Sequence, residues 1–182
     1  MKYLELLQPQ VKGPQYKEDI KFLEFLEVSP KGPWLVGGAA RKLFYGLHQD
    51  ADWDIAFGSY AQKTHLEYFI LEETGTLRTI FDDTYKASSY NLMDRQVQLT
   101  SFIGTTVESV MDRYFPLTVS GFAFDGEKFI VAEEALGAVN SNTLTANLSR
   151  TEPIRGNIMA HIHKYMEKGF SPPDSSIFKD LS

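Results

Sequence analysis

The chain has 182 residues, 43% of them hydrophobic and 13% aromatic, so it can bury a core within a single globular unit. The absence of cysteine excludes disulfides and thiolate metal sites, and the N-terminal stretch MKYLELLQPQ lacks the long apolar run of a signal peptide or membrane span. A net charge of −6 argues against wholesale electrostatic binding of nucleic acid, while leaving room for a local basic patch. We therefore expect a cytoplasmic protein without a membrane segment.

Hydrophobic periodicity predicts alternating helices and strands in the first half of the chain. A short apolar run predicts a buried strand that ends at Gly37 and Gly38, where a helix begins that Gly46 ends. A turn at Asp94 and Arg95 is expected to join two strands as a hairpin. Helices are expected over 16–28, 39–45 and 61–73, and strands over 34–36, 52–57, 76–81, 88–93 and 96–102.

Two local signals mark the second half of the chain. Thr105 and Glu108 fit a capping box, in which each side chain satisfies a backbone N–H group at the start of a short helix. Asp125 and Gly126 form a strong turn signal, which predicts a second hairpin. The strands of that hairpin are expected over 117–124 and 128–131.

The chain is expected to end in one more helix and a loosely held tail. Thr151 is placed to cap this helix, whose apolar stripe continues until Gly169 ends it. We expect an α/β (α+β) fold in which helices pack on a mixed β-sheet. The expected units are an N-terminal helical extension over 1–33, a central domain over 34–149 and a C-terminal helix with its tail over 150–182.

A pair of aspartates is the first candidate for chemistry. Asp52 and Asp54 are two apart on a predicted strand, so both carboxylates project from one face. At a separation of about 7 Å they repel by roughly 2 kcal/mol at an effective dielectric near 20, which a cation would relieve. Oxygen ligands without sulfur suit Mg²⁺ or Mn²⁺, ions that activate a hydroxyl and brace a leaving pyrophosphate. The alternative interpretation is a solvated acidic turn.

The glycine pair is the second candidate. Gly37 and Gly38 follow a strand and open a helix, so free N–H groups and the positive helix end can meet phosphate oxygens. Arg41, one turn further, can add a fork of donors. The alternative is an ordinary tight turn. Together with the carboxylate pair on the next strand, such a cradle would hold a metal–triphosphate.

Three other basic side chains are expected to be structural or solvated. His161 and His163 are two apart on a helix and point about 200° apart, so they cannot close on one metal ion. We expect both to be solvated or hydrogen-bonded. Lys42 is expected on the solvated face of its short helix, with a phosphate contact as the alternative.

The segments LVGGAARKLFYG and DADWDIAF resemble the head domain of class II CCA-adding enzymes and bacterial poly(A) polymerases, in the polymerase-β-like nucleotidyltransferase superfamily. The matching residues are Gly37, Gly38, Arg41, Gly46, Asp52, Asp54 and Ile55. The resemblance implies a nucleotidyltransferase fold over 34–149 in which Asp52 and Asp54 hold catalytic magnesium ions. It also implies that the glycine pair and Arg41 face the triphosphate.

The resemblance continues more faintly toward the C-terminus. EPIRGNIMAHIHKYMEKGF is similar to a helix of this family, which makes Arg155 a candidate triphosphate ligand, with pairing to an acid as the alternative. In YFPLTVSG, Thr118 is the clearest match to a nucleotide-binding segment. The chain departs from the family at Gln98, where the family has a third carboxylate, and at Lys42, where it has aspartate.

The expected function is Mg²⁺-dependent transfer of a nucleotidyl group from ATP or CTP to a hydroxyl acceptor, with an RNA 3′ end such as that of tRNA as the favoured acceptor. The body and tail domains that grip tRNA in CCA-adding enzymes have no counterpart here, so a protein partner is expected to supply that surface. Gln98 keeps a second hypothesis open, a catalytically decayed module that binds a nucleotide or a partner.

Overall fold

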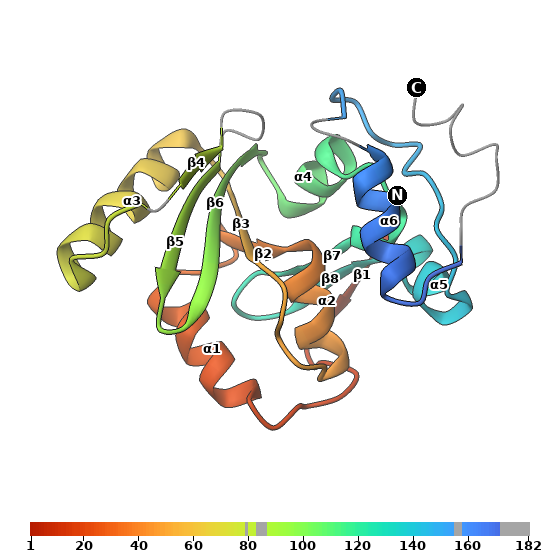
Figure 1. The fold of residues 1–182 in the computed structure, drawn as a ribbon, viewed down its shortest axis with the longest axis horizontal. Coiled ribbons are helices and arrows are strands. Elements are labelled where there is room, and N and C mark those ends of the chain that lie inside the picture. The colour runs from red at the N-terminus through yellow and green to blue at the C-terminus, as the bar shows by residue number, and fades with distance from the viewer. Residues whose placement is uncertain (79, 83–86, 155–157, 172–182) are drawn as a thin grey trace.

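An eight-stranded sheet in the order β1-β8-β7-β2-β3-β6-β5-β4 forms the centre of the computed structural model, which describes residues 1–78, 80–82, 87–154 and 158–171 (Figure 1). β3 and β6 run parallel, and every other neighbouring pair is antiparallel, so the sheet is mixed as predicted. The strands are β1 Tyr3–Leu6, β2 Trp34–Val36, β3 Trp53–Phe57, β4 Ile80–Asp82, β5 Ala87–Leu92, β6 Arg95–Ile103, β7 Phe122–Phe124 and β8 Phe129–Ala132.

Six α-helices are described, together with one short 3₁₀ turn at Thr118–Ser120. The helices are α1 Tyr16–Phe25, α2 Gly37–Tyr45, α3 Tyr60–Thr74, α4 Val107–Tyr114, α5 Glu133–Ser141 and α6 Ile158–Glu167. The expected helices all form, most of them with shifted ends, and Gly46 caps α2 as predicted. Thr151 does not cap α6 as expected, because the residues that directly follow it, 152–154, are not helical. β1 and α5 were not predicted from the sequence.

The two predicted hairpins form, and one of them shifts by a residue. The β7–β8 turn lies at Asp125 and Gly126, where Asp125 Oδ1 accepts hydrogen bonds from the backbone N–H groups of residues 127 and 128. The β5–β6 turn lies at Met93 and Asp94, both at positive φ, rather than at Asp94 and Arg95. Arg95 instead begins β6 opposite Leu92.

Two predictions for the second half are wrong in detail. The capping box of α4 joins Thr106 and Ser109, because Thr106 has the extended backbone of an N-cap and Thr105 lies one residue too early. The expected strand over 117–124 is divided, because Thr118 donates its backbone N–H to Thr145 and its carbonyl accepts from Gly121 in a tight turn. Only the last part of that stretch forms β7.

The alternation along β3 divides its side chains between the two faces of the sheet. Trp53, Ile55 and Phe57 enter the main core, which includes residues of α1, α2 and α3. Ala56 belongs to a second cluster together with residues of α4. Asp54, which alternates with these core residues, therefore projects on the α4 side, where it lines a cavity together with the end of α4.

A third and smaller cluster supports the C-terminal helix. Its buried members are Leu117, Val119, Ala138, Leu144 and Ile162, contributed by the segments around α5 and α6. α6 lies beside α4 and α5 in Figure 1. α6 therefore packs on a cluster separate from the main core, and other side chains of the helix line a cavity shared with β3 and β6.

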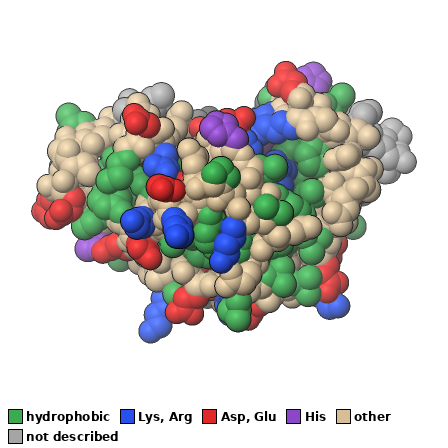
Figure 2. All heavy atoms as spheres, turned by 90° about the horizontal axis from the view of Figure 1, so that it is seen from below, with side chains coloured by type: hydrophobic (Ala, Val, Ile, Leu, Met, Phe, Trp, Pro, Cys, Tyr) green, Lys and Arg blue, Asp and Glu red, His purple; other side chains and the backbone are tan. Residues whose placement is uncertain are grey.

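The surface combines both signs of charge. Figure 2 shows Lys and Arg side chains interspersed with Asp and Glu on the face seen from below. Across the part of the chain that the structure describes, no helix has both the length and the apolar character needed to cross a bilayer.

Candidate nucleotide-binding site

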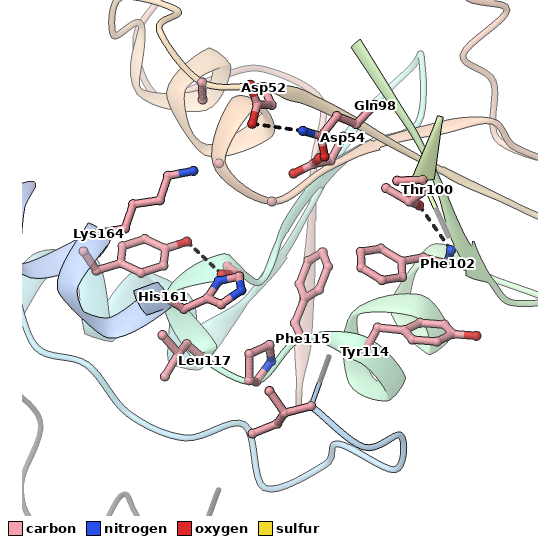
Figure 3. Close-up of a pocket in the computed structure, with 18 of the residues that line it drawn as sticks. Asp52, Asp54, Gln98, Thr100, Phe102, Tyr114, Phe115, Leu117, His161 and Lys164 are labelled. Carbon is pink, nitrogen blue, oxygen red and sulfur yellow. Dashed lines mark hydrogen bonds between the residues drawn. The ribbon is translucent and has the colours of Figure 1, made fainter. Parts of the chain in front are cut away.

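A cavity of about 340 Å³ lies where α2 begins, beside the start of β3. Side chains of β3, β6, the end of α4 and α6 also line it, and Figure 3 shows how they converge. Segments separated by more than a hundred residues in the sequence thus meet around one space. Its walls differ in chemical character.

The acidic wall contains both predicted aspartates. Asp54 lies on β3 opposite Val36 of β2 and Gln98 of β6, and Asp52 lies just before the strand. Both carboxylates reach the cavity, as the strand alternation predicts. Gln98 Nε2 donates a hydrogen bond to Asp52 Oδ2 at 3.1 Å, so the Gln98 amide directly contacts one carboxylate of this pair (Figure 3).

The electrostatics of this wall favour a bound cation. Burial, and then the neighbouring Asp52 carboxylate, raise the pKa of Asp54 to about 7, while Lys164 acts in the opposite direction. A divalent ion would remove the mutual repulsion and restore the ionised form. Among the described residues no group of three or more His, Asp or Glu side chains forms a complete metal shell. Two carboxylates completed by water and substrate oxygens fit Mg²⁺, which binds proteins in that way.

The start of α2 forms the floor of the cavity. Gly37 has a φ of +73°, in the left-handed region, and a Cβ built there would lie 3.8 Å from Asp54 Oδ2. A Cβ on Gly38 would meet Ala51 at 3.7 Å, an ordinary contact. Gly37 is therefore needed for the backbone, whereas Gly38 mainly keeps the cavity floor free of side chains.

These two glycines should respond differently to substitution. Gly37→Ala is expected to lower the free energy of unfolding by about 1 kcal/mol or more, because an L-residue is strained at this φ. Gly38→Ala and Gly38→Val should stay close to wild type in Tm but weaken triphosphate binding, since a side chain would occupy the floor of the cavity. Thermal melts and calorimetric titrations with Mg–ATP separate the two effects. Unchanged affinity in a folded Gly38→Val protein would mean that the glycines form only a turn.

Arg41 does not lie where the resemblance places it. Its side chain is 5% exposed, and the guanidinium lies over the rings of Tyr165 and Phe170 at 5.2 and 5.4 Å from their centroids. It is not among the described residues that line the cavity. Because α6 packs over α2, aromatic rings cover the face of α2 that would otherwise reach a phosphate.

Thr118 also lies away from the cavity lining. It is 4% exposed, and its hydroxyl is hydrogen-bonded to Thr145, to which Thr118 also donates its backbone N–H. Its side chain has a structural partner in this structure. Arg155, the third predicted nucleotide ligand outside the acidic wall and the glycines, lies outside the described residues.

Lys42 is another correction to the sequence interpretation. It is 8% exposed rather than solvated, and its ammonium pairs with Asp50 in the loop before β3. Burial, followed by the cations Lys168, Arg41 and Lys164, lowers the pKa of Lys42. The residue therefore belongs to a group of basic side chains between α2 and α6.

Four side chains in and just after α6 that were not assigned to the site line the cavity. They are His161, Lys164 and Tyr165 of α6, and Lys168 in the turn that follows it. Their spacing of three, four and seven residues places them on one face of a helix, which is the sequence signal that could have found them. Burial, and then Lys164, lower the pKa of His161, which lines the cavity rather than a solvated face. Figure 3 shows Lys164 extending from α6 toward the aspartates.

The remaining wall is apolar. Phe102 at the end of β6 stacks on Tyr114 at the end of α4, with ring centroids 4.9 Å apart, and Phe115 meets Phe102 edge-on. All three line the cavity. The space thus has an acidic wall, a basic wall on the α6 side and an aromatic wall (Figure 3), a combination suited to a ligand with a metal-bound charge, a further anionic group and a ring.

A mixed sheet, a glycine turn that opens a helix and a carboxylate pair on the next strand together describe the nucleotidyltransferase head fold. Solved structures confirm this class of fold. A tRNA-processing enzyme in its apo form superposes with a TM-score of 0.61 and 15% sequence identity, covering 94% of this chain and 47% of the other.

CCA-adding enzymes have the same fold. The complex with ATP matches at a TM-score of 0.61 and 14% identity, covering 92% of this chain and 44% of the enzyme. The complex with CTP matches at a TM-score of 0.57 and 15% identity, covering 88% of this chain and 40% of the enzyme. The chain thus spans less than half the length of these proteins. No protein-family model and no curated protein sequence matches it. The chain has the nucleotidyltransferase fold of the CCA-adding enzyme head.

Proposed function

We propose that this chain is a nucleotidyltransferase domain that uses Mg²⁺ or Mn²⁺ to move a nucleotidyl group from ATP or CTP to the 3′ hydroxyl of an RNA. The observation that supports this most strongly is that Asp52 and Asp54 share a cavity with the N-terminus of α2. One element suits a cation and the other a phosphate. The solved relatives in complex with ATP and CTP support the choice of nucleotide.

In the proposed reaction an acceptor oxygen forms a bond to the α-phosphorus, and the bond from that phosphorus to the bridging oxygen breaks. Pyrophosphate leaves with the electron pair, and the acceptor hydroxyl gives its proton to solvent water. A divalent ion held at this site would lower the pKa of the acceptor hydroxyl and would neutralise the leaving group. Asp52 and Asp54 would hold that ion, and the N–H groups at Gly37 and Gly38 would orient the phosphates.

Gln98 favours one alternative function. Its amide brings no negative charge to the acidic wall, although it contacts Asp52. A site that holds the metal less firmly is suited to a module that binds a nucleotide without transferring it. The two proposals share their ligand and differ only in turnover.

Binding and turnover can be measured separately. Mg²⁺ with ATP or CTP at about 100 times Kd should stabilise the folded protein by about 2.7 kcal/mol. For a chain of this length, that corresponds to roughly 5–11 °C in Tm. Incorporation of each labelled nucleoside triphosphate into a pool of total RNA then reports transfer.

The combination of results decides between the proposals. A rise in Tm together with incorporation supports the transferase. A rise in Tm without incorporation into any RNA favours the binding module. If no nucleoside triphosphate changes Tm in the presence of Mg²⁺ or Mn²⁺, both proposals are wrong.

A further inference from the structure

Two lysines at the C-terminal end of α6 stand across the cavity from the acidic wall. Lys164 belongs to α6 and Lys168 lies in the turn that directly follows it, and both line the same space as Asp52 and Asp54. Both lysines remain solvent-exposed at the rim. In Figure 3 the ammonium of Lys164 points into the cavity toward the carboxylates.

These lysines belong to a larger group of basic side chains. Arg41 and Lys42 of α2 lie close enough to interact electrostatically with them. Lys42 pairs with Asp50, but neither Lys164 nor Lys168 forms an ion pair with another described residue. The buried Nη1 of Arg41 has no hydrogen-bond partner in the described chain. The carboxylates of the acidic wall attract Lys164 and Lys168 across the cavity, but the cations repel one another, and a bound anion removes that cost.

The two charged walls narrow the class of ligand. A metal ion alone would satisfy the aspartates and leave the lysines unpaired, whereas a simple anion would do the reverse. A metal–polyphosphate has both parts, because the ion binds the carboxylates while the distal phosphate oxygens extend beyond it. Lysine ammonium groups bind phosphate as compact charges.

We propose that Lys164 and Lys168 bind the distal phosphates of the metal–nucleoside triphosphate, in the place that the sequence assigned to Arg41. This inference rests on the proposed function and adds to it the residues that hold the leaving pyrophosphate. Arg41 packs beneath Tyr165, which lies between the two lysines in the sequence and whose hydroxyl shares a hydrogen bond with Ser120. These contacts hold the C-terminal end of α6, where Lys164 and Lys168 lie.

The test compares ligands that differ in their phosphates. Isothermal titration measures binding of Mg–ATP, Mg–tripolyphosphate and adenosine to wild type, to Lys164→Gln, to Lys168→Gln and to the double variant. Each single substitution should weaken Mg–tripolyphosphate and Mg–ATP about tenfold or more, the effect of one charge-assisted hydrogen bond. The double variant should lose about a hundredfold, while adenosine binding stays unchanged.

Matched variants control for charge and folding. Lys2→Gln removes an exposed cation that pairs with Glu133 outside the cavity, and it should leave both affinities unchanged. Lys164→Arg combined with Lys168→Arg keeps the charge and should retain most of the affinity. Because both lysines are exposed, all of these proteins should melt within about 2 °C of wild type.

The possible failures are distinguishable. If wild type binds Mg–ATP and Mg–tripolyphosphate and the double glutamine variant binds them equally well, this inference is overturned and the proposed function stands. An equal loss of adenosine binding would also overturn it, because the lysines would not act through phosphate. If wild type binds neither phosphate ligand, the inference and the proposed function fail together.

Discussion

Asp54→Asn is expected to reduce nucleotidyl transfer by at least about 10²-fold and, in the same protein, to raise the Tm of the metal-free form. Transfer falls because a neutral amide cannot hold the ion that stabilises charge in the transition state. Stability rises because the free protein no longer keeps a carboxylate beside Asp52 in a partly buried site. Opposite changes in activity and stability distinguish a functional carboxylate from a structural one.

The size of the stability gain follows from the pKa of Asp54. Its pKa rises from 3.8 to about 7 on folding, and each unit is worth 1.36 kcal/mol, so the upper bound is about 4 kcal/mol. Solvent in the cavity screens the charge, and we expect about 1–2 kcal/mol, or roughly 2–8 °C. Thermal melts in a chelating buffer measure this difference.

The pH dependence gives the sign of the effect. A carboxyl whose pKa is raised on folding stabilises the protein fully below pH 3.8, and this contribution is lost as the pH rises through about 7. The advantage of Asp54→Asn should therefore be greatest above pH 7 and should vanish near pH 4. Asp94→Asn is the matched control, because Asp94 is exposed in the β5–β6 turn, outside the acidic wall. A metal-free Asp54→Asn protein that melts below wild type at pH 8 would contradict the assignment.

Gln98→Glu is expected to increase transfer by as much as the roughly 10²–10⁴-fold effect typical of a positioned acid–base group. Gln98 already contacts Asp52 and faces Asp54 across the β3–β6 pair, so a glutamate there completes a set of three carboxylates. The same change should lower the Tm of the metal-free protein, since it replaces a hydrogen-bond donor by a like charge. Single-turnover incorporation and melts with and without Mg²⁺ measure the two effects.

Gln98→Ala serves as the control for this substitution, because it removes the hydrogen bond to Asp52 without adding charge. If wild type and Gln98→Glu are equally inactive with every nucleotide and RNA, the binding module becomes the better description. If wild type transfers nucleotides rapidly and Gln98→Glu slows the transfer, the glutamine itself suits the reaction. The inference of a weakened metal site is then wrong.

Helices and strands could be predicted from the sequence where strong signals lay within a few adjacent residues. The strand, glycine turn and helix at β2 and α2 follow from an apolar run with glycines at both ends of the helix. β1 was missed because four residues give too little alternation, and its partner β8 lies more than a hundred residues away. α5 was missed because it begins directly after β8 at Ala132, without a capping side chain.

In the site, too, local sequence patterns predicted some positions, and long-range packing determined the others. Asp52 and Asp54 could be predicted to share a space because the period of a strand determines which face each side chain occupies. The positions of Arg41 and Lys164 depend on how α6 packs against α2, a contact between segments about 120 residues apart that no local pattern specifies. Sequence therefore indicated the acidic wall, and only the tertiary structure revealed the basic one.

The placement of α6 on its own small cluster means that the two charged walls belong to parts of the molecule with different local stability. Asp54 lies on a strand anchored in the main core through Ile55 and Phe57, whereas α6 buries Ile162 in the satellite cluster. Partial opening of α6 would remove the lysines and leave the carboxylates in place. Affinity for any ligand that bridges both walls thus includes the free energy of keeping α6 docked, and substitutions beneath the helix can weaken binding without touching the ligand.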